Sequence, residues 1–286
     1  MSVAAESVAL PRGRSTAARA FAFARRHALT LYALLAFSYL LVPIVVVVLF
    51  SFNHPHGRFN YTWQGFTLDN WIHWDAVPGL RGAVELSLEI AAISSVCATA
   101  LGALIALALV RYGFRGRGAT NLLIFLPMST PEIVLGASLL TLFLTMNVAT
   151  GFWTIVIAHV MFNISYVVVT VKARLVGFDR HLEEAAMDLG ANEWTTFWRV
   201  TMPLIAPGIL AALLLAFALS VDDFVITNFN AGTTVTFPLF VWGAARAAVF
   251  PQINVVGTAI FAVAVIAMLL SIVLQNRRTR RAVKGH

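Results

Sequence analysis

The chain has 286 residues, of which 59% are hydrophobic and 12% charged, with a mean hydropathy of +0.83 and a pI of about 10.3. About a quarter of the residues of an ordinary soluble domain are charged, so this composition excludes a soluble globular protein. The single Cys97 lies in an apolar run, which excludes a disulfide framework and a cysteine-based metal or redox site. The high pI does not predict nucleic-acid binding, because in a membrane protein the basic residues mark the side of the membrane that faces the cytoplasm.

Six apolar stretches are long enough to cross a bilayer, which takes about 20 residues. They are 29–52, 84–110, 121–146, 152–171, 203–226 and 253–274. The sequence therefore predicts an all-helical polytopic membrane protein with six transmembrane helices. The expected organisation is a tail at 1–28, a six-helix domain at 29–275 and a tail at 276–286.

Basic residues are unevenly distributed between the segments that join these stretches. All but three of the 20 basic residues lie in the two tails and in the segments after the second and fourth stretches. The exceptions are Arg58, Arg81 and Arg246. Since short cytoplasmic segments carry the excess of Lys and Arg, we expect both termini in the cytoplasm.

The cytoplasmic segment 177–207 is the most informative part of the sequence. Asp179 is a suitable N-cap for a first short helix, and Gly190 is placed to end it. Asn192 is placed to cap a second helix, which we expect to stop before Pro203 because proline disrupts a helix interior. The pattern predicts a helical hairpin at the membrane surface.

Both helices of this hairpin would carry an apolar face. These faces consist of Leu182, Ala185, Ala186 and Leu189 in the first helix, and Trp194, Phe197 and Trp198 in the second. An apolar hairpin on a chain without a cytoplasmic domain indicates a protein partner. The alternative is an amphipathic helix lying on lipid, but such helices carry Lys and Arg on the polar face, whereas this one carries Glu and Asp.

The run Glu184-Ala185-Ala186, followed by Gly190 and then Pro203, resembles the EAA loop of ABC-importer permease subunits. The residues before Pro203 depart conservatively from the usual pattern. In that family the loop docks into a cleft of a separate ATPase subunit. The resemblance implies that the ATPase-coupling residues are Glu183, Glu184, Ala185, Ala186, Asp188, Gly190 and Pro203.

Segments 63–66 (WQGF), 131–136 (PEIVLG), 157–160 (IAHV) and 219–224 (LSVDDF) look like the second permease subunit of spermidine/putrescine importers. Glu89 departs from this pattern, since these permeases more often carry a small polar residue there. The resemblance implies a bacterial inner-membrane importer of the type I ABC class. Its partners would be a second homologous permease, an ATPase dimer and an extracytoplasmic binding protein, with membrane lipid around the spans and no nucleic acid.

The same resemblance implies that this chain is a transport subunit and not an enzyme. It would bind no cofactor, because ATP and Mg²⁺ would be held by the partner ATPase. Related systems carry thiamine, opines, ferric iron or aminophosphonates, so these substrates are alternatives to a polyamine. An ion-coupled secondary transporter is a further alternative, but such a carrier has no use for an acidic docking hairpin.

Acidic residues within or beside the spans are candidates for the substrate pathway, because a carboxylate facing lipid is costly. Glu132 would lie about 16 Å along a helix that begins at Asn121, and prolines flank it. Asn163 and Tyr166, on the following span, reach a similar depth and would complete a polar pocket. The alternative role for Glu132 is to bond backbone groups freed by the prolines.

Further acids lie near the predicted outer membrane surface. Asp222 and Asp223 stand near the end of the fifth span, and Glu89 near the start of the second. Separated carboxylates with aromatic walls suit a protonated polyamine. The alternative for the Asp pair is helix capping, and we expect one of the two to serve structure because adjacent positions point in different directions.

Overall fold

The structure, a computed structural model, describes residues 16–57, 59–177, 179 and 181–284. Within these ranges the regular structure is helical, apart from isolated bridge residues such as the antiparallel pair Asn53 and Phe66. The chain divides into two compact units. Unit 1 is Met1–Trp74 with Pro251–His286, and unit 2 is Asp75–Phe250.

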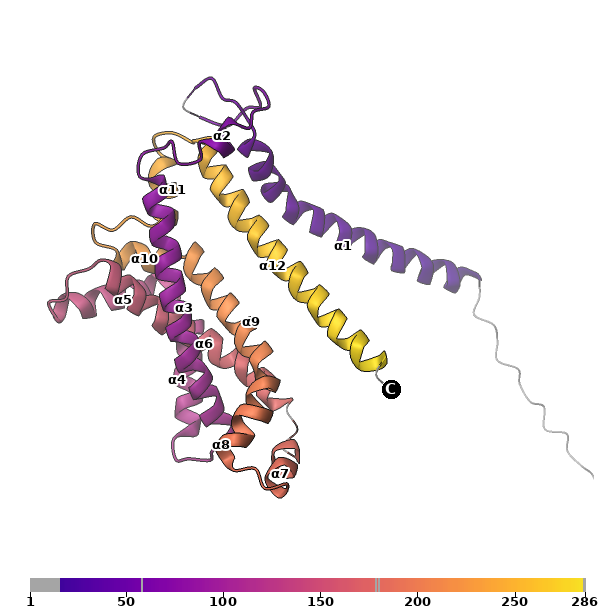
Figure 1. Cartoon of the computed structure of the whole chain (residues 1–286). Coiled ribbons are helices and arrows are strands. Elements are labelled where there is room, and N and C mark those ends of the chain that lie inside the picture. Colours follow the sequence, from indigo (N-terminus) through magenta and orange to yellow (C-terminus); the bar gives the residue numbers. More distant parts are fainter. Residues whose placement is uncertain (1–15, 58, 178, 180, 285–286) are drawn as a thin grey trace, which may run out of the picture. The chain divides into compact units, whose positions relative to one another are not determined.

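Unit 1 contains α1 (Thr16–Ser51), the short α2 (Asp69–Ile72) and α12 (Pro251–Lys284). α1 and α12 meet near α2 and diverge from there (Figure 1). Buried amides hold the segment between α1 and α2. The Asn53 side chain donates to Asn60 Oδ1 at 2.6 Å, and Asn70 donates to the Asn53 carbonyl at 2.7 Å. These bonds satisfy polar groups that would otherwise lie buried without partners.

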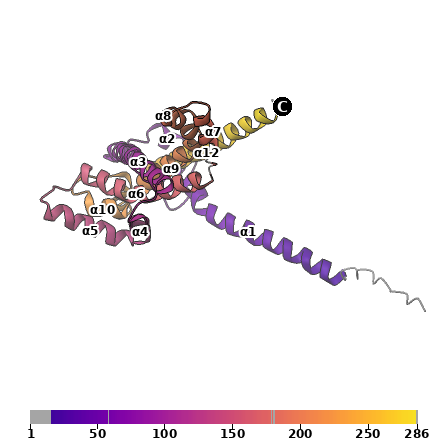
Figure 2. The same cartoon turned by 90° about the horizontal axis from the view of Figure 1, so that it is seen from below.

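Unit 2 contains the remaining helices. They are α3 (Leu80–Arg111), α4 (Arg117–Ser129), α5 (Glu132–Thr145), α6 (Phe152–Val176), α7 (His181–Asp188), α8 (Glu193–Thr196), the π-helical segment Phe197–Thr201, α9 (Met202–Asp222), α10 (Val225–Asn230) and α11 (Phe237–Ala244). α3, α6 and α9 pack against one another, and α5 lies beside α10 (Figures 1 and 2).

Small residues allow α3, α6 and α9 to approach closely. The core between them includes Ala98, Ala106, Val167 and Ala216. A Cβ atom added at Gly102 would lie 2.6 Å from the Cγ1 atom of Val167, so only glycine fits this crossing. In lipid, helices associate through close packing of this kind because the surrounding chains are as apolar as the side chains.

The third predicted span, 121–146, is not one helix. It forms α4 and α5, which are bent by 107° at Thr130 and Pro131. Thr130 has a ψ of 133°, an extended conformation that the following proline favours for steric reasons. Glu132 is therefore the first residue of α5, and not a position within a continuous helix.

The other predicted spans agree better with the structure. α1 from His27, α3, α6 and the helix Glu193–Asp222 are each long and apolar enough to cross a membrane, and α12 has a shorter apolar part, Pro251–Ile266. The fifth span ends before the predicted residue 226, because α9 stops at Asp222. Of the predicted tails, residues 1–15 and 285–286 lie outside the described residues, while Thr16 already belongs to α1. The prediction of an all-helical polytopic membrane protein is confirmed.

Candidate functional site

The first helix of the predicted hairpin, α7, has the expected ends. Asp179 Oδ1 accepts a hydrogen bond from the backbone N–H of His181 at 3.0 Å. Gly190 follows the helix with a φ of 89°, and its N–H donates to the carbonyl of Met187 at 2.9 Å. Positive φ is the conformation in which glycine ends a helix, so the roles predicted for Asp179 and Gly190 are confirmed.

The second helix differs from the prediction. Asn192 caps α8 as expected, accepting a backbone N–H at 2.8 Å. However, α8 does not stop before Pro203. It continues through the π-helical segment Phe197–Thr201 into α9, and Pro203 lies in the first turn of α9. The wider π turn gives a proline ring room that a regular helix lacks, and the missing N–H is tolerated near a helix start.

The two adjacent glutamates of α7 point in different directions. The Glu184 side chain is 61% exposed and accepts a bond from the exposed His181 at 3.1 Å. The Glu183 side chain is only 16% exposed and pairs with Arg111 and Thr201. The sequence analysis grouped both acids as docking residues, but of the two only Glu184 has an exposed side chain.

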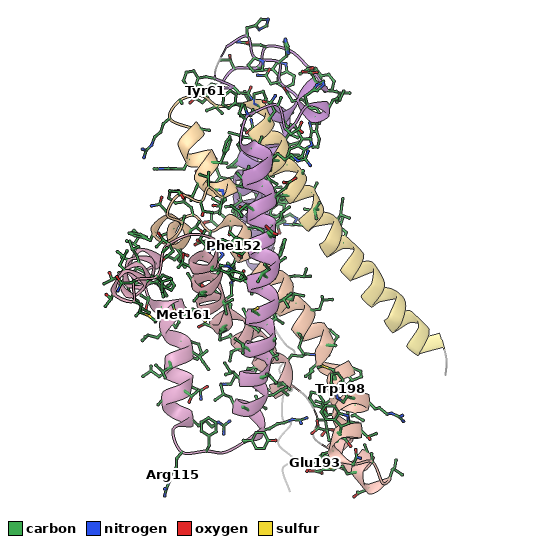
Figure 3. The ribbon with its side chains drawn as sticks, turned by 60° about the vertical axis from the view of Figure 1, so that its left-hand side comes forward. Tyr61, Arg115, Phe152, Met161, Glu193 and Trp198 are labelled. Atoms are coloured by element: carbon green, nitrogen blue, oxygen red, sulfur yellow. The ribbon has the colours of Figure 1, made fainter. Side chains whose placement is uncertain are left out.

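The remaining surface of the α7–α8 hairpin (His181–Thr196) with the adjoining π-helical segment is apolar and uncovered. α7 contains no buried residue, and Asp188 and Pro203 are exposed. The exposed apolar side chains are Leu182 at 49%, Met187 at 42%, Leu189 at 90%, Trp194 at 70% and Trp198 at 48%. Glu193 and Trp198 lie at the same end of unit 2 as Arg115 (Figure 3). This end therefore joins apolar, acidic and basic groups.

A buried polar cluster lies where α6, α9 and α10 meet. His159 is 2% exposed, and its Nδ1 lies 2.6 Å from Ser220 Oγ. Its Nε2 lies 2.9 Å from Thr227 Oγ1 and 3.2 Å from Asp223 Oδ2. Asp223 also accepts the backbone N–H of Thr227 at 2.8 Å. Asp223 therefore holds the start of α10 and binds His159, while its side chain is only 6% exposed.

The other candidate acids are exposed and are not members of this cluster. Asp222, Glu132 and Glu89 are all exposed. Glu85 forms an exposed ion pair with Arg81 at 2.7 Å. In the part of the chain that the structure describes, no three His, Cys, Asp or Glu side chains are gathered in a way that could hold a metal ion.

The predicted partners of Glu132 on α6 are placed differently from the expectation. Asn163 is fully buried, and neither atom of its amide has a hydrogen-bond partner among the described residues, so it does not bond Glu132. Tyr166 packs its ring against Phe162, with centroids 5.0 Å apart. Asn163 lies one helical turn beyond His159 on the same face of α6, which places it next to the buried cluster.

Sequence reasoning missed two functional candidates. His159 appeared only within a family motif, although an ionisable residue in a span is costly and requires a partner. Its partners Ser220 and Asp223 belong to the segment 219–224, and only tertiary packing brings that segment to α6. Arg111 was used only for topology, yet it reaches Glu183, 72 positions along the chain.

Residues 98–283 match the family model described as "Binding-protein-dependent transport system inner membrane component". The chain is 36% identical over 245 residues to the spermidine/putrescine transport system permease protein PotC of Escherichia coli K12, covering 85% of this chain and 92% of that protein. It is also 36% identical over 260 residues to the putrescine transport system permease protein PotI of the same strain, covering 88% and 92%.

Solved structures show the same fold at low sequence identity. A chain of a bacterial ABC transporter involved in the import of the acidic polysaccharide alginate matches with a TM-score of 0.63 at 17% identity, covering 92% of this chain and 99% of that chain. A chain of the methionine ABC transporter MetNI, in an inward-facing conformation, matches with a TM-score of 0.55 at 14% identity, covering 67% and 92%.

Proposed function

Because the chain belongs to the family of binding-protein-dependent transport system inner membrane components, we propose that it is the permease subunit of an ABC importer for a polyamine such as spermidine or putrescine. The observation that carries the importer assignment is the exposed α7–α8 hairpin, whose apolar and acidic surface is that of a docking element. The polyamine assignment is supported by the names of relatives that align with nearly the whole chain.

The importer would be assembled from several subunits. The α7–α8 hairpin would dock into an ATPase dimer, which binds ATP and Mg²⁺ and carries out the hydrolysis. A second homologous permease would supply the other half of the pathway, and an extracytoplasmic binding protein would deliver substrate. In this arrangement Glu184, Ala185, Ala186, Asp188 and Gly190 belong to the docking element, and Pro203 lies at the point where the hairpin enters the span.

The substrate would meet exposed acids near the ends and breaks of helices. We assign this role to Asp222, Glu132 and Glu89, because their side chains are exposed and available to an ammonium group. Asp222 also precedes Phe224, whose ring lies 5.2 Å from the Trp242 ring and supplies an aromatic wall. Asp223 would instead serve structure, since its carboxylate is already used by His159 and Thr227.

An uptake assay tests the substrate. Cells that lack their own polyamine importers would carry this chain with its sister permease, ATPase and binding protein. We expect them to accumulate radiolabelled spermidine or putrescine, and to lose this uptake when the gene for this chain is omitted. Uptake of thiamine or of an opine, without uptake of either polyamine, would contradict the proposed substrate.

The distribution of basic residues supports an orientation in the inner membrane with both termini in the cytoplasm. A cysteine at Gly57 is expected to react with an impermeant maleimide added to intact cells, and a cysteine at Gly113 is expected to react only after permeabilisation. Both glycines have open space at the Cβ position, so the substitutions do not disturb packing. Cys97 would be replaced by serine in both variants. The reverse labelling pattern would overturn the orientation.

A further inference from the structure

Glu183 is placed where it cannot serve the docking surface. Its side chain is 16% exposed, compared with 61% for the neighbouring Glu184. Glu183 Oε1 accepts from the Arg111 guanidinium and from the Thr201 hydroxyl. Arg111 Nη2 also donates to Thr201 Oγ1 at 3.1 Å, so the three side chains form a closed cluster.

The cluster joins three separate elements of unit 2. Glu183 lies in the first turn of α7, Arg111 is the last residue of α3, and Thr201 ends the π-helical segment just before α9. Thr201 is fully buried. α7 has no buried residue and contacts α8 and the π-helical segment, so this cluster is what ties it by side-chain bonds to α3.

α3 and α9 are also the helices that carry candidate substrate acids at their opposite ends. Glu89 lies in the early turns of α3, and Asp222 is the last residue of α9. Because α3 and α9 pack along each other through a tight core, a displacement at one end is passed to the other rather than absorbed. The cluster therefore lies at the start of a physical connection from the hairpin to the candidate pathway.

We propose that Glu183 is a positioning residue for energy coupling: its bonds to Arg111 and Thr201 fasten α7 to the inner ends of α3 and α9, so that movement of the docked hairpin reaches both helices. This role rests on the proposed function, in which a partner ATPase moves the hairpin. An Arg–carboxylate pair suits the task, because the planar guanidinium holds a fixed direction and is always charged.

The test separates positioning from docking. In Glu183→Gln and in Arg111→Gln, the complete complex in proteoliposomes is expected to keep its ATPase subunits, while the spermidine taken up per ATP hydrolysed falls by about tenfold, within the usual range for coupled sites. The exchange of both charges, Arg111→Glu with Glu183→Arg, should restore most of the loss. Glu85→Gln, which makes the same change at an exposed acid of α3 outside the hairpin, is the matched control and should behave like the parent.

A second measurement does not depend on the substrate. Spin labels would be placed at Leu189 and Phe114, both exposed, in the full chain with Cys97 replaced by serine. The distance distribution is expected to be narrow in the parent, to broaden in Glu183→Gln, and to narrow again in the charge exchange. If the parental complex takes up no polyamine, the proposed function fails while this measurement still decides the role of Glu183.

Two outcomes would overturn the proposal. Unchanged uptake per ATP together with an unchanged distance distribution in both single variants would show that the cluster positions nothing. Loss of ATPase association in Glu183→Gln would make Glu183 a docking residue. A variant that does not insert into the membrane would be replaced by Thr201→Val, which removes one donor to Glu183 without changing any charge.

Discussion

Glu184→Arg is expected to abolish co-purification of the ATPase subunits with this chain and, with it, all transport. The Glu184 side chain is exposed on α7 and contacts His181, which is more exposed still, so reversing the charge of Glu184 leaves the fold intact. At a desolvated interface, however, an Arg in the place of a carboxylate is left without a suitable partner, which disfavours association by several kcal/mol. The measurement is the ATPase-to-permease ratio after affinity purification in detergent.

Glu85→Arg provides the comparison for this variant, since it makes the same charge change at an exposed acid outside the hairpin. We expect it to retain the ATPase subunits, because Glu85 lies in α3 and not on the docking hairpin. Normal association of Glu184→Arg with the ATPase would contradict the assignment of the hairpin as the docking element.

Substitution of Gly190 is expected to weaken ATPase association less than Glu184→Arg does. A side chain at this position has open space, so the only penalty is the left-handed backbone conformation, about 1 kcal/mol.

Among the acids, Glu132→Gln and Asp222→Asn are each expected to reduce uptake of spermidine by about tenfold or more, since a hydrogen bond to a charged group contributes about 2 kcal/mol. The amides keep the shape of the side chains, so the variants isolate the charge. Both acids are exposed, and membrane insertion and ATPase association should therefore persist. Initial rates of radiolabelled spermidine uptake provide the measurement.

Asp223→Asn is the matched variant with a different expected result. The introduced amide would replace a carboxylate that accepts from Thr227 and faces His159, and at least one buried donor would lose its acceptor. Such a loss destabilises by about 1–3 kcal/mol. We therefore expect a lower thermal midpoint of the purified chain, measured by fluorescence-detected size exclusion after heating.

If Glu132→Gln and Asp222→Asn took up spermidine at the parental rate, both acids would be removed from the proposed substrate pathway.

Local patterns in the sequence were sufficient to predict four of the membrane spans and both ends of α7. Hydropathy predicts α1, α3, α6 and α9 because each must be apolar over the thickness of a bilayer. The ends of α7 follow from Asp179 and Gly190, whose side-chain oxygen and positive φ act within a few residues. The proline at position 131 likewise indicated a break, though not its angle of 107°.

Tertiary structure decided what the individual acids do. Glu183 and Glu184 are adjacent and chemically identical, as are Asp222 and Asp223, so no local rule assigns them different roles. In each pair the role depends on a partner far away in the chain: Arg111 for Glu183, and His159 for Asp223. The sequence by itself determined where charges and helices lie along the chain. Packing alone determined which charges are paired and buried, because a buried charge requires a partner that only the folded arrangement brings within reach.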